Sequence, residues 1–261
     1  MENKYDAIII GMGPSGIFLA YELIELKKAK NILMIDQGKR VEDRICPIEK
    51  AGKCVKCKPF CNITSGFSGA GAFSDGKLSL YNEEDDDIYV GGILHEYIGV
   101  ENTKKLIDYT DKIYLKFGAD EKLEGVNYKE EVNKIKEKSK KQGINLINIP
   151  IRHLGTEKAH ELYKKLEKHL ENNNINMMFE TEVTDLIIDN NTVRGVKVVN
   201  KKDSSEKELL SDNVVIAVGR KGANWLVNMC DKHNIVTKSG CVDIGVRYEL
   251  PDEVKEMASQ Y

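Results

Sequence analysis

The sequence predicts an α/β fold: a Rossmann-like domain with a parallel central sheet and an antiparallel β-meander, plus a helical insertion and the start of a second domain. Three features predict it. The apolar run Tyr5–Ile10 leads directly into a glycine-rich turn and an amphipathic segment. A second apolar run, Asn31–Ile35, ends in Asp36. Runs between residues 182 and 210 alternate with Asn, Asp and Lys turns, which is typical of antiparallel strands.

The composition is that of a folded protein without a strong charge. Of its 261 residues, 41% are hydrophobic, which is enough for one large or two modest domains. The 39 basic and 42 acidic side chains nearly cancel, so we expect no nucleic-acid partner. No apolar stretch could cross a bilayer and the first residues form no secretory signal, so we expect a cytoplasmic protein without membrane contact. A small-molecule substrate is favoured, and the oligomeric state stays open.

The periodicity of apolar residues predicts the elements in chain order. Apolar positions at helical spacing after Pro14 predict the first helix, and the strand Asn31–Ile35 completes a strand–helix–strand unit that begins with Tyr5–Ile10. Between Gln37 and Gly76 the chain is rich in Gly, Cys, Pro, Ser and Lys, which predicts a long functional loop broken by a short helix.

The later elements are predicted in the same way. Amphipathic helices are expected at Lys104–Phe117, Tyr128–Gln142 and Glu157–Glu171, and the lysines of the second should form a solvated surface. Strands are expected at residues 144–149, just before Pro150, and then at Ile175–Phe179, Glu182–Ile188, Thr192–Val199, Glu206–Leu210 and Val214–Val218.

Residues 11–16, G-M-G-P-S-G, form a G-x-G-x-x-G motif between a buried strand and a helix. Gly11 permits the tight turn, Gly13 lets the backbone approach a pyrophosphate, and Gly16 lets the helix pack closely on the strand. The helix begins at Pro14 and Ser15, where free N–H groups and the helix dipole favour an anion. The motif predicts a dinucleotide site.

Asp36 lies 25 residues after Gly11, at the end of the second strand. A carboxylate there can accept hydrogen bonds from the ribose hydroxyls of an adenosine and would repel a 2′-phosphate. The neighbouring Gln37 and Gly38 are assigned to the same cofactor site. The alternative is a chance glycine turn with a surface aspartate, which the complete strand, turn, helix, strand and acid context disfavours.

The long segment between the first strand–helix–strand unit, which ends at Ile35, and the next predicted strand of the parallel sheet favours FAD over NAD as the cofactor. An NAD domain would continue with short alternating strands and helices, whereas here the sheet resumes only at Ile175–Phe179. In two-dinucleotide-binding flavoproteins, which the chain resembles in this layout, a strand near Val183 places its backbone against the adenine. An Ala-x-Gly strand end also passes near the cofactor there, and Ala217 and Gly219 supply that pattern.

Three further segments carry a resemblance to a known family. Residues 61–78, CNITSGFSGAGAFSDGKL, residues 150–156, PIRHLGT, and residues 242–247, VDIGVR, resemble signatures of the uncharacterised bacterial FAD-dependent dehydrogenases, within the NAD(P)/FAD-dependent oxidoreductases. The resemblance implies a flavoprotein whose Gly-Ala-Gly loop packs near the isoalloxazine. The sequence departs from the family at Phe67 and Ser68, where Trp and Gly are expected.

The resemblance also implies which loop residues contact the cofactor. Glycines there allow close approach, hydroxyls can bind phosphate or ribityl oxygens, and a lysine can stabilise a reduced anionic flavin. The alternative is a structural glycine-rich turn. The residues assigned to this role are Ser68, Gly69, Gly71, Ser74, Gly76 and Lys77.

Four segments are expected along the chain. Residues 1–100 should form the first part of the FAD-binding domain, 101–145 a helical insertion, 146–235 the second part, and 236–261 the truncated start of a substrate domain. A new strand-like run begins at Val242, so we expect the N-terminal part of a longer protein. The resemblance places further flavin contacts in that missing part, so this chain alone should bind FAD weakly.

Four cysteines are grouped with the spacing C-x7-C-x2-C-x3-C: Cys46, Cys54, Cys57 and Cys61. They could bind zinc or an iron–sulfur cluster through four thiolates. They could instead include a redox-active Cys54–Cys57 pair that exchanges electrons with the flavin, or be unligated structural thiols. Lysines between them favour thiolates. The spacing leaves the three possibilities open.

The predicted function is that of an FAD-dependent oxidoreductase that transfers hydride through bound flavin, with NAD(P)H as a possible electron donor. No catalytic acid or base is required by the sequence. Arg152 and His153 could bind an anionic substrate or donate a proton, or could form a buried structural pair. The alternatives are an NAD(P)-binding protein without flavin, a non-catalytic or RNA-modification-type flavoprotein, and an inactive fragment.

Overall fold

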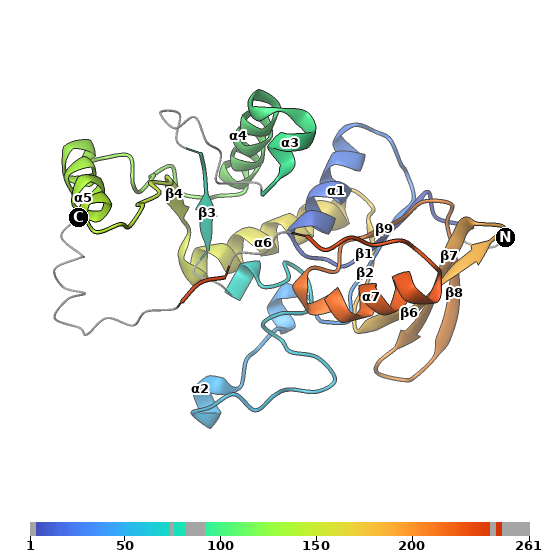
Figure 1. Ribbon diagram of the computed structural model, residues 1–261. Coiled ribbons are helices and arrows are strands. Elements are labelled where there is room, and N and C mark those ends of the chain that lie inside the picture. Colours follow the sequence, from blue (N-terminus) through green and yellow to red (C-terminus); the bar gives the residue numbers. More distant parts are fainter. Residues whose placement is uncertain (1–3, 74–75, 82–91, 241–243, 247–261) are drawn as a thin grey trace.

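The computed structural model describes residues 4–73, 76–81, 92–240 and 244–246 (Figure 1). Ser74 therefore lies outside the described residues. So does most of the strand expected from Val242, and its three described residues, 244–246, have no regular secondary structure. The substrate domain expected at 236–261 thus stays a prediction.

A four-stranded parallel sheet forms the centre of the fold, in the order β5-β2-β1-β9. Its strands are β1 (Ala7–Ile10), β2 (Ile32–Ile35), β5 (Asn176–Met178) and β9 (Val214–Ile216). Every residue of β1 and β2 is buried, as expected for strands covered on both faces. Helix α1 (Pro14–Glu25) connects β1 to β2, which confirms the predicted Rossmann-like unit.

Helices cover one face of this sheet and the meander covers the other. Ile9 and Met34 pack with α1 and with α6 (Gly155–Asn172), whereas Ile8 and Leu33 point to the opposite side. There they meet the antiparallel strands β6 (Thr181–Asp189), β7 (Thr192–Asn200) and β8 (Glu206–Leu210). The predicted meander is confirmed, because β6 pairs antiparallel with β7 and β7 pairs antiparallel with β8.

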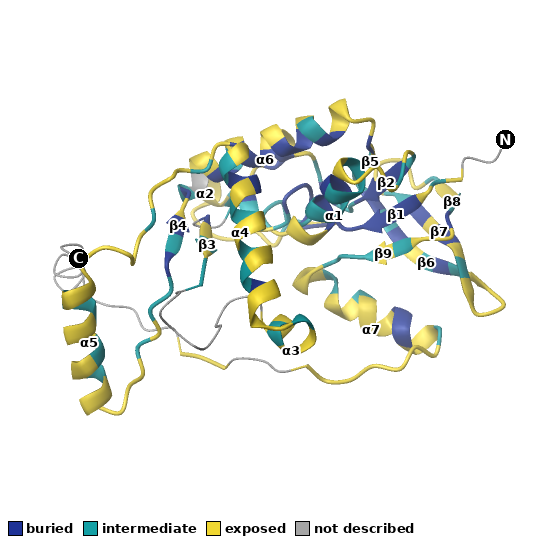
Figure 2. Ribbon diagram, turned by 90° about the horizontal axis from the view of Figure 1, so that it is seen from above, coloured by how far each residue is buried: buried dark blue, intermediate teal, exposed yellow. Residues whose placement is uncertain are grey.

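Three helices follow in the chain: α3 (Leu94–Ile98), α4 (Val100–Lys116) and α5 (Lys129–Lys141). The last two confirm the helices predicted at Lys104–Phe117 and Tyr128–Gln142. No residue of α5 is buried, and the helix lies at one end of the molecule with an exposed surface (Figure 2). The solvated surface predicted for its lysines is confirmed.

One predicted strand is wrong. Residues 144–149 have no regular structure, and the strand β4 (Ile151–His153) begins just after Pro150. Its antiparallel partner β3 (Lys77–Ser79) is only three residues long, and it pairs with Ile151–His153. The apolar run before Pro150 therefore has no neighbouring strand among the described residues.

The expected loop from Gln37 to Gly76 is present and contains short helical turns. These are η1 (Val41–Asp43), α2 (Ile48–Ala51) and η2 (Gly71–Phe73), and the segment that carries α2 extends away from the sheet (Figure 1). After β9, the turn η3 (Arg220–Gly222) leads into α7 (Ala223–Lys232). No helix in the described part of the chain has the length and hydropathy of a membrane span.

Candidate functional site

The glycine turn after β1 leaves the start of α1 open. A Cβ atom at Gly11, where φ is +104°, would collide with the carbonyl oxygen of Ala217, and one at Gly16 would collide with the carbonyl oxygen of Gly11. Gly13 differs, because a Cβ atom there would have no neighbour within 4 Å. Gly13 is also the N-cap of α1, and no side chain caps this helix. The N–H groups at its start can therefore bind an anion.

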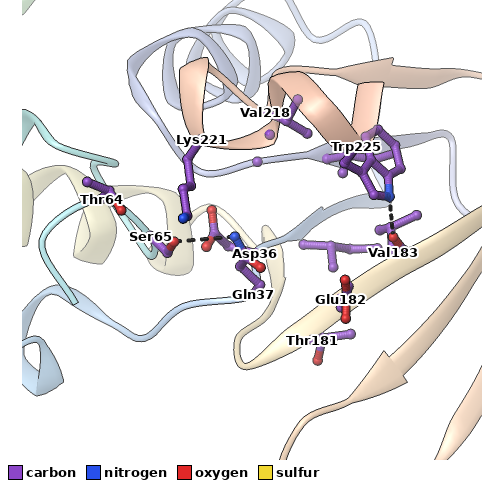
Figure 3. Close-up of a pocket in the computed structure, with 14 residues that line it drawn as sticks. Asp36, Gln37, Thr64, Ser65, Thr181, Glu182, Val183, Val218, Lys221 and Trp225 are labelled. Carbon is purple, nitrogen blue, oxygen red and sulfur yellow. Dashed lines mark hydrogen bonds between the residues drawn. The ribbon is translucent and has the colours of Figure 1, made fainter. Parts of the chain in front are cut away.

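A cavity lies beside this turn, at the carboxyl ends of β1 and β2 (Figure 3). Besides Gly11 and Asp36, the start of β6, residues 64–65 and the beginning of α7 line it. Ligands of open α/β sheets bind at this edge, where the direction of the strand order reverses. The predicted residues Gly11, Asp36, Gln37 and Val183 are all brought to this one cavity, and Ala217 lies against Gly11.

Asp36 joins three separate backbone segments. Its Oδ2 atom accepts a 3.0 Å hydrogen bond from the N–H of Met12, in the glycine turn. Its Oδ1 atom accepts hydrogen bonds from the N–H groups of Gly38, at 2.8 Å, and Gly66, at 2.7 Å. A carboxylate has about four acceptor positions, so roughly one is left for a ligand. The side chain thus positions the turn as well as facing the cavity.

Most residues that line the cavity were not predicted from the sequence, among them Trp225 and Lys221. Trp225 on α7 donates a hydrogen bond from Nε1 to the carbonyl oxygen of Val183, at 2.7 Å. Lys221 extends from η3 toward Asp36 and Ser65 (Figure 3). A lone tryptophan shortly after the predicted Ala-x-Gly strand end was the available signal, since large aromatic side chains are common in ligand pockets.

The glycine-rich loop packs directly against the turn. The N–H of Ser68 donates a 2.7 Å hydrogen bond to the carbonyl oxygen of Met12. A Cβ atom at Gly69 would lie 3.3 Å from the Cα atom of Gly13. The hydroxyl of Ser68 is fully buried and accepts a 2.9 Å hydrogen bond from Arg44. Gly69 is thus near any anion at Gly13, whereas the Ser68 hydroxyl is occupied within the protein.

Arg44 holds the loop in place and was also not predicted. The residue is 2% exposed. Its guanidinium donates to main-chain carbonyls of residues 62, 63, 67 and 69 and lies over the ring of Phe73. Burial lowers the pKa of Arg44 to about 10, and the nearby charge of Asp36 opposes this shift. The group therefore stays charged at neutral pH. An isolated arginine in an irregular segment gives no sequence signal for such a role.

The remaining predicted loop residues lie away from the turn. A Cβ atom at Gly71 would meet Tyr163 of α6, and one at Gly76 would meet Leu154 and Ala159, at and after the start of α6. Lys77 lines a different cavity, between β3 and α4. Gly219 is exposed at the start of η3, with φ at +59°. Their assignment to the cofactor stays a prediction.

The four clustered cysteines do not form the predicted metal site. Within the described residues no three Cys, His, Asp or Glu side chains are close enough together to hold a metal ion. All four thiols are free, so Cys54 and Cys57 form no disulfide. Cys54 is exposed, while Cys46 and Cys57 line a separate cavity. The loop spreads the thiols apart because it follows an irregular path, which the spacing alone does not reveal.

Arg152 belongs to a structural ion pair. Its Nε and Nη2 atoms each donate to a carboxylate oxygen of Asp111 at 2.6 Å, and its side chain is 5% exposed. This pair joins β4 to α4. The guanidinium is therefore already paired, whereas His153 is partly exposed and lies 4.0 Å from Glu124.

Comparisons with known proteins match part of the chain to a family of flavin-binding domains. Residues 148–247 match the FAD binding domain family. The chain is 36% identical over 78 residues to an uncharacterized protein of Clostridium beijerinckii, across 30% of this chain and 14% of that protein. The residues matched to the family include β6 and α7 on one side of the cavity, whereas the glycine turn and Asp36 precede them and lie outside the match.

Two solved structures are similar in outline. L-proline dehydrogenase from P. horikoshii has a TM-score of 0.49 and 17% identity, over 91% of this chain and 58% of that chain. Glycine oxidase from Bacillus cereus has a TM-score of 0.46 and 17% identity, over 87% of this chain and 58% of that chain. The chain thus spans 58% of the length of each of these proteins. Residues 148–247, which include β6 and α7, are thus similar to the FAD binding domain family.

Proposed function

We propose that this chain binds FAD and forms the cofactor-binding part of an FAD-dependent oxidoreductase. One observation carries the proposal: the uncapped start of α1, with open space at Gly13, adjoins a cavity that contains the Asp36 carboxylate. An anion site beside a ribose-binding carboxylate is the arrangement that a dinucleotide requires. The match of residues 148–247 to the FAD binding domain family supports FAD in particular.

The pyrophosphate would lie at the start of α1. The helix dipole and the free N–H groups of its first turn favour negative charge there. Gly13 leaves the space that two phosphates need, and Gly69 borders it from the loop side. Lys221 lies within the same cavity and supplies a positive charge near the ribose and phosphates.

The adenosine would occupy the cavity between Asp36 and Val183. The remaining acceptor position of Asp36 suits a ribose hydroxyl. An adenine amino group could donate to the carbonyl oxygen of Val183, which at present accepts from Trp225. Nucleotide binding therefore requires the indole to share or release that oxygen.

The flavin, when bound, supplies hydride transfer, and the protein supplies binding and orientation. In this chain the Arg44-held loop fixes Gly69 beside the turn, so the anion site is formed before the cofactor arrives. A small-molecule substrate and an electron donor such as NAD(P)H belong to the proposal. No acid or base of this chain is assigned to the reaction.

The test is a set of calorimetric titrations with FAD, ADP, FMN and NAD⁺. The contacts argued above involve only the ADP half, so FAD and ADP should bind with similar dissociation constants and FMN should not bind. Binding of FMN as tight as that of FAD, or a preference for NAD⁺, would contradict the proposal.

A further inference from the structure

A second cavity lies in the cysteine segment, apart from the nucleotide cleft. It has a volume of about 480 Å³ and lies between the chain around Cys46 and Pro47, the chain from Cys57 to Asn62, and Lys39 at the end of the sheet. A water molecule takes up about 30 Å³ in the liquid, so the space admits a molecule of several heavy atoms. Nothing in the proposed flavin chemistry uses it.

Lysines dominate the charge of this cavity. Lys39, Lys50 and Lys58 line it, and none of them forms an ion pair with any of the described residues. A fourth, Lys201, is paired with Glu182. The carboxylate that lines the cavity, Glu180, is paired with Lys202 at 2.5 Å. Three lysines that form no ion pair with a described residue thus concentrate positive charge around one space, which favours an anion there.

We infer that this cavity binds a small organic anion that carries two or more phosphate or carboxylate groups. Lysines are suited to such groups because each ammonium provides up to three donors on a flexible stem. Pro47, Pro59 and Phe60 supply an apolar wall for the rest of the ligand. The ligand would make several charge-assisted hydrogen bonds, which are stronger than neutral ones.

Two free thiols in the wall make the site measurable. Cys46 and Cys57 line the cavity, while Cys54 belongs to the same segment, is exposed and does not line it. A bound anion covers the first two and leaves Cys54 open to reagents. The protection pattern of the three thiols therefore reports occupancy without any flavin.

The site is independent of the nucleotide cleft, although the two share a wall. Phe60 and Asn62 face the anion cavity, and Thr64 and Ser65 face the nucleotide cavity. An experiment without FAD tests the anion site alone. Failure of FAD binding would leave its result unchanged.

The test measures alkylation of each cysteine in the full chain by iodoacetamide, a neutral reagent, with peptide mass spectrometry. The probes are inorganic pyrophosphate and citrate at constant ionic strength. When the probe concentration is about ten times its dissociation constant, the alkylation rates of Cys46 and Cys57 should fall by about tenfold. The alkylation rate of Cys54 should stay unchanged. Protection by one probe alone identifies phosphate or carboxylate as the preferred group.

Two matched variants distinguish binding of the probe in the cavity from a general effect of the segment's positive charge. The double variant Lys50→Gln/Lys58→Gln removes two cavity lysines, and Lys53→Gln/Lys56→Gln removes two lysines of the same segment that do not line the cavity. Protection should weaken by about tenfold in the first and persist in the second. Equal loss in both variants, equal protection of Cys54, or no protection by either probe would overturn the inference.

Discussion

The indole Nε1 of Trp225 donates a 2.7 Å hydrogen bond to the main-chain oxygen of Val183, and this contact joins α7 to β6 across the nucleotide cavity. The two residues are 42 positions apart in the sequence. Val183 is buried and otherwise offers its carbonyl to the cavity. A ligand amino group that binds the same oxygen must compete with the indole.

This competition can be observed directly, because Trp225 is the only tryptophan of the chain. Titration with ADP, which does not absorb where tryptophan is excited, should change its emission intensity and wavelength. Trp225→Phe removes the competing donor, so ADP should bind more tightly by about the value of one hydrogen bond, roughly 0.5–1.5 kcal/mol. Calorimetry measures that change. Weaker ADP binding by the variant would mean that the ring stacks on the ligand instead of competing with it.

Two glycines of the turn should respond differently to the same substitution. Gly13→Ala adds a methyl group to open space, so the melting temperature should stay unchanged while ADP binding is lost. Gly16→Ala forces a methyl group into the carbonyl oxygen of Gly11, so it should destabilise the fold by about 1–3 kcal/mol. Thermal unfolding and ADP titration of both variants check this. Retained ADP binding by Gly13→Ala would mean that the pyrophosphate does not bind at this turn.

The sequence was sufficient to predict those parts of the fold that depend on residues close together in the chain. The buried runs of β1 and β2, the glycine turn and Asp36 follow from local pattern, and all are found where predicted. The roles of Trp225 and Arg44 depend on partners elsewhere in the chain, which no periodicity reveals. The run at 144–149 has strand-like residues but no partner strand among the described residues, and pairing decides whether a strand forms.

Arg44 should be essential for the order of the glycine-rich loop. Arg44→Met keeps much of the side-chain volume but leaves four buried or half-buried carbonyl oxygens without their donor. Loss of such a buried charged donor costs about 3–5 kcal/mol. Urea unfolding measures the loss, and limited proteolysis should detect cleavage between residues 61 and 73. Arg44→Lys serves as the control that keeps the charge but satisfies fewer carbonyls.

The attachment of α7 should weaken in acid. Burial alone raises the pKa of Asp185, but hydrogen bonds from Lys232, His233 and the N–H of Leu186 outweigh it and lower the pKa below its ordinary value of 3.8. A lowered carboxyl pKa adds stability that is fully present above the unfolded value and is lost as the pH falls through the folded one.

Acrylamide quenching of Trp225 should therefore stay constant from pH 7 to about pH 5 and increase below about pH 4. Asp185→Asn keeps the size of the side chain but removes its charge, so quenching should already be high at pH 7. If quenching at neutral pH were the same in Asp185→Asn as in the unaltered protein, the contacts of Asp185 with Lys232 and His233 would not hold α7 in place.

Asp36 combines a structural and a binding role, and a matched aspartate can separate the two. Asp6 also accepts two backbone hydrogen bonds, from Lys30 at 2.7 Å and Asn31 at 2.9 Å, but it lies outside the nucleotide cavity. Replacement by Asn removes the charge that strengthens these hydrogen bonds in either side chain. At Asp36, where both oxygens accept, it also turns one acceptor into a donor that faces a backbone N–H group. Both Asp36→Asn and Asp6→Asn should therefore lower stability, by about 1–3 kcal/mol.

Only Asp36→Asn should also weaken ADP binding, because its carboxylate alone is placed to accept from the ribose. The variant should lose discrimination against a 2′-phosphate as well, since the repelling charge is gone. Calorimetric titration with ADP and with 2′-phospho-ADP-ribose measures both effects at a temperature where each variant is folded. If Asp6→Asn lost ADP affinity to the same extent, the effect would come from destabilisation, and Asp36 would have only its structural role.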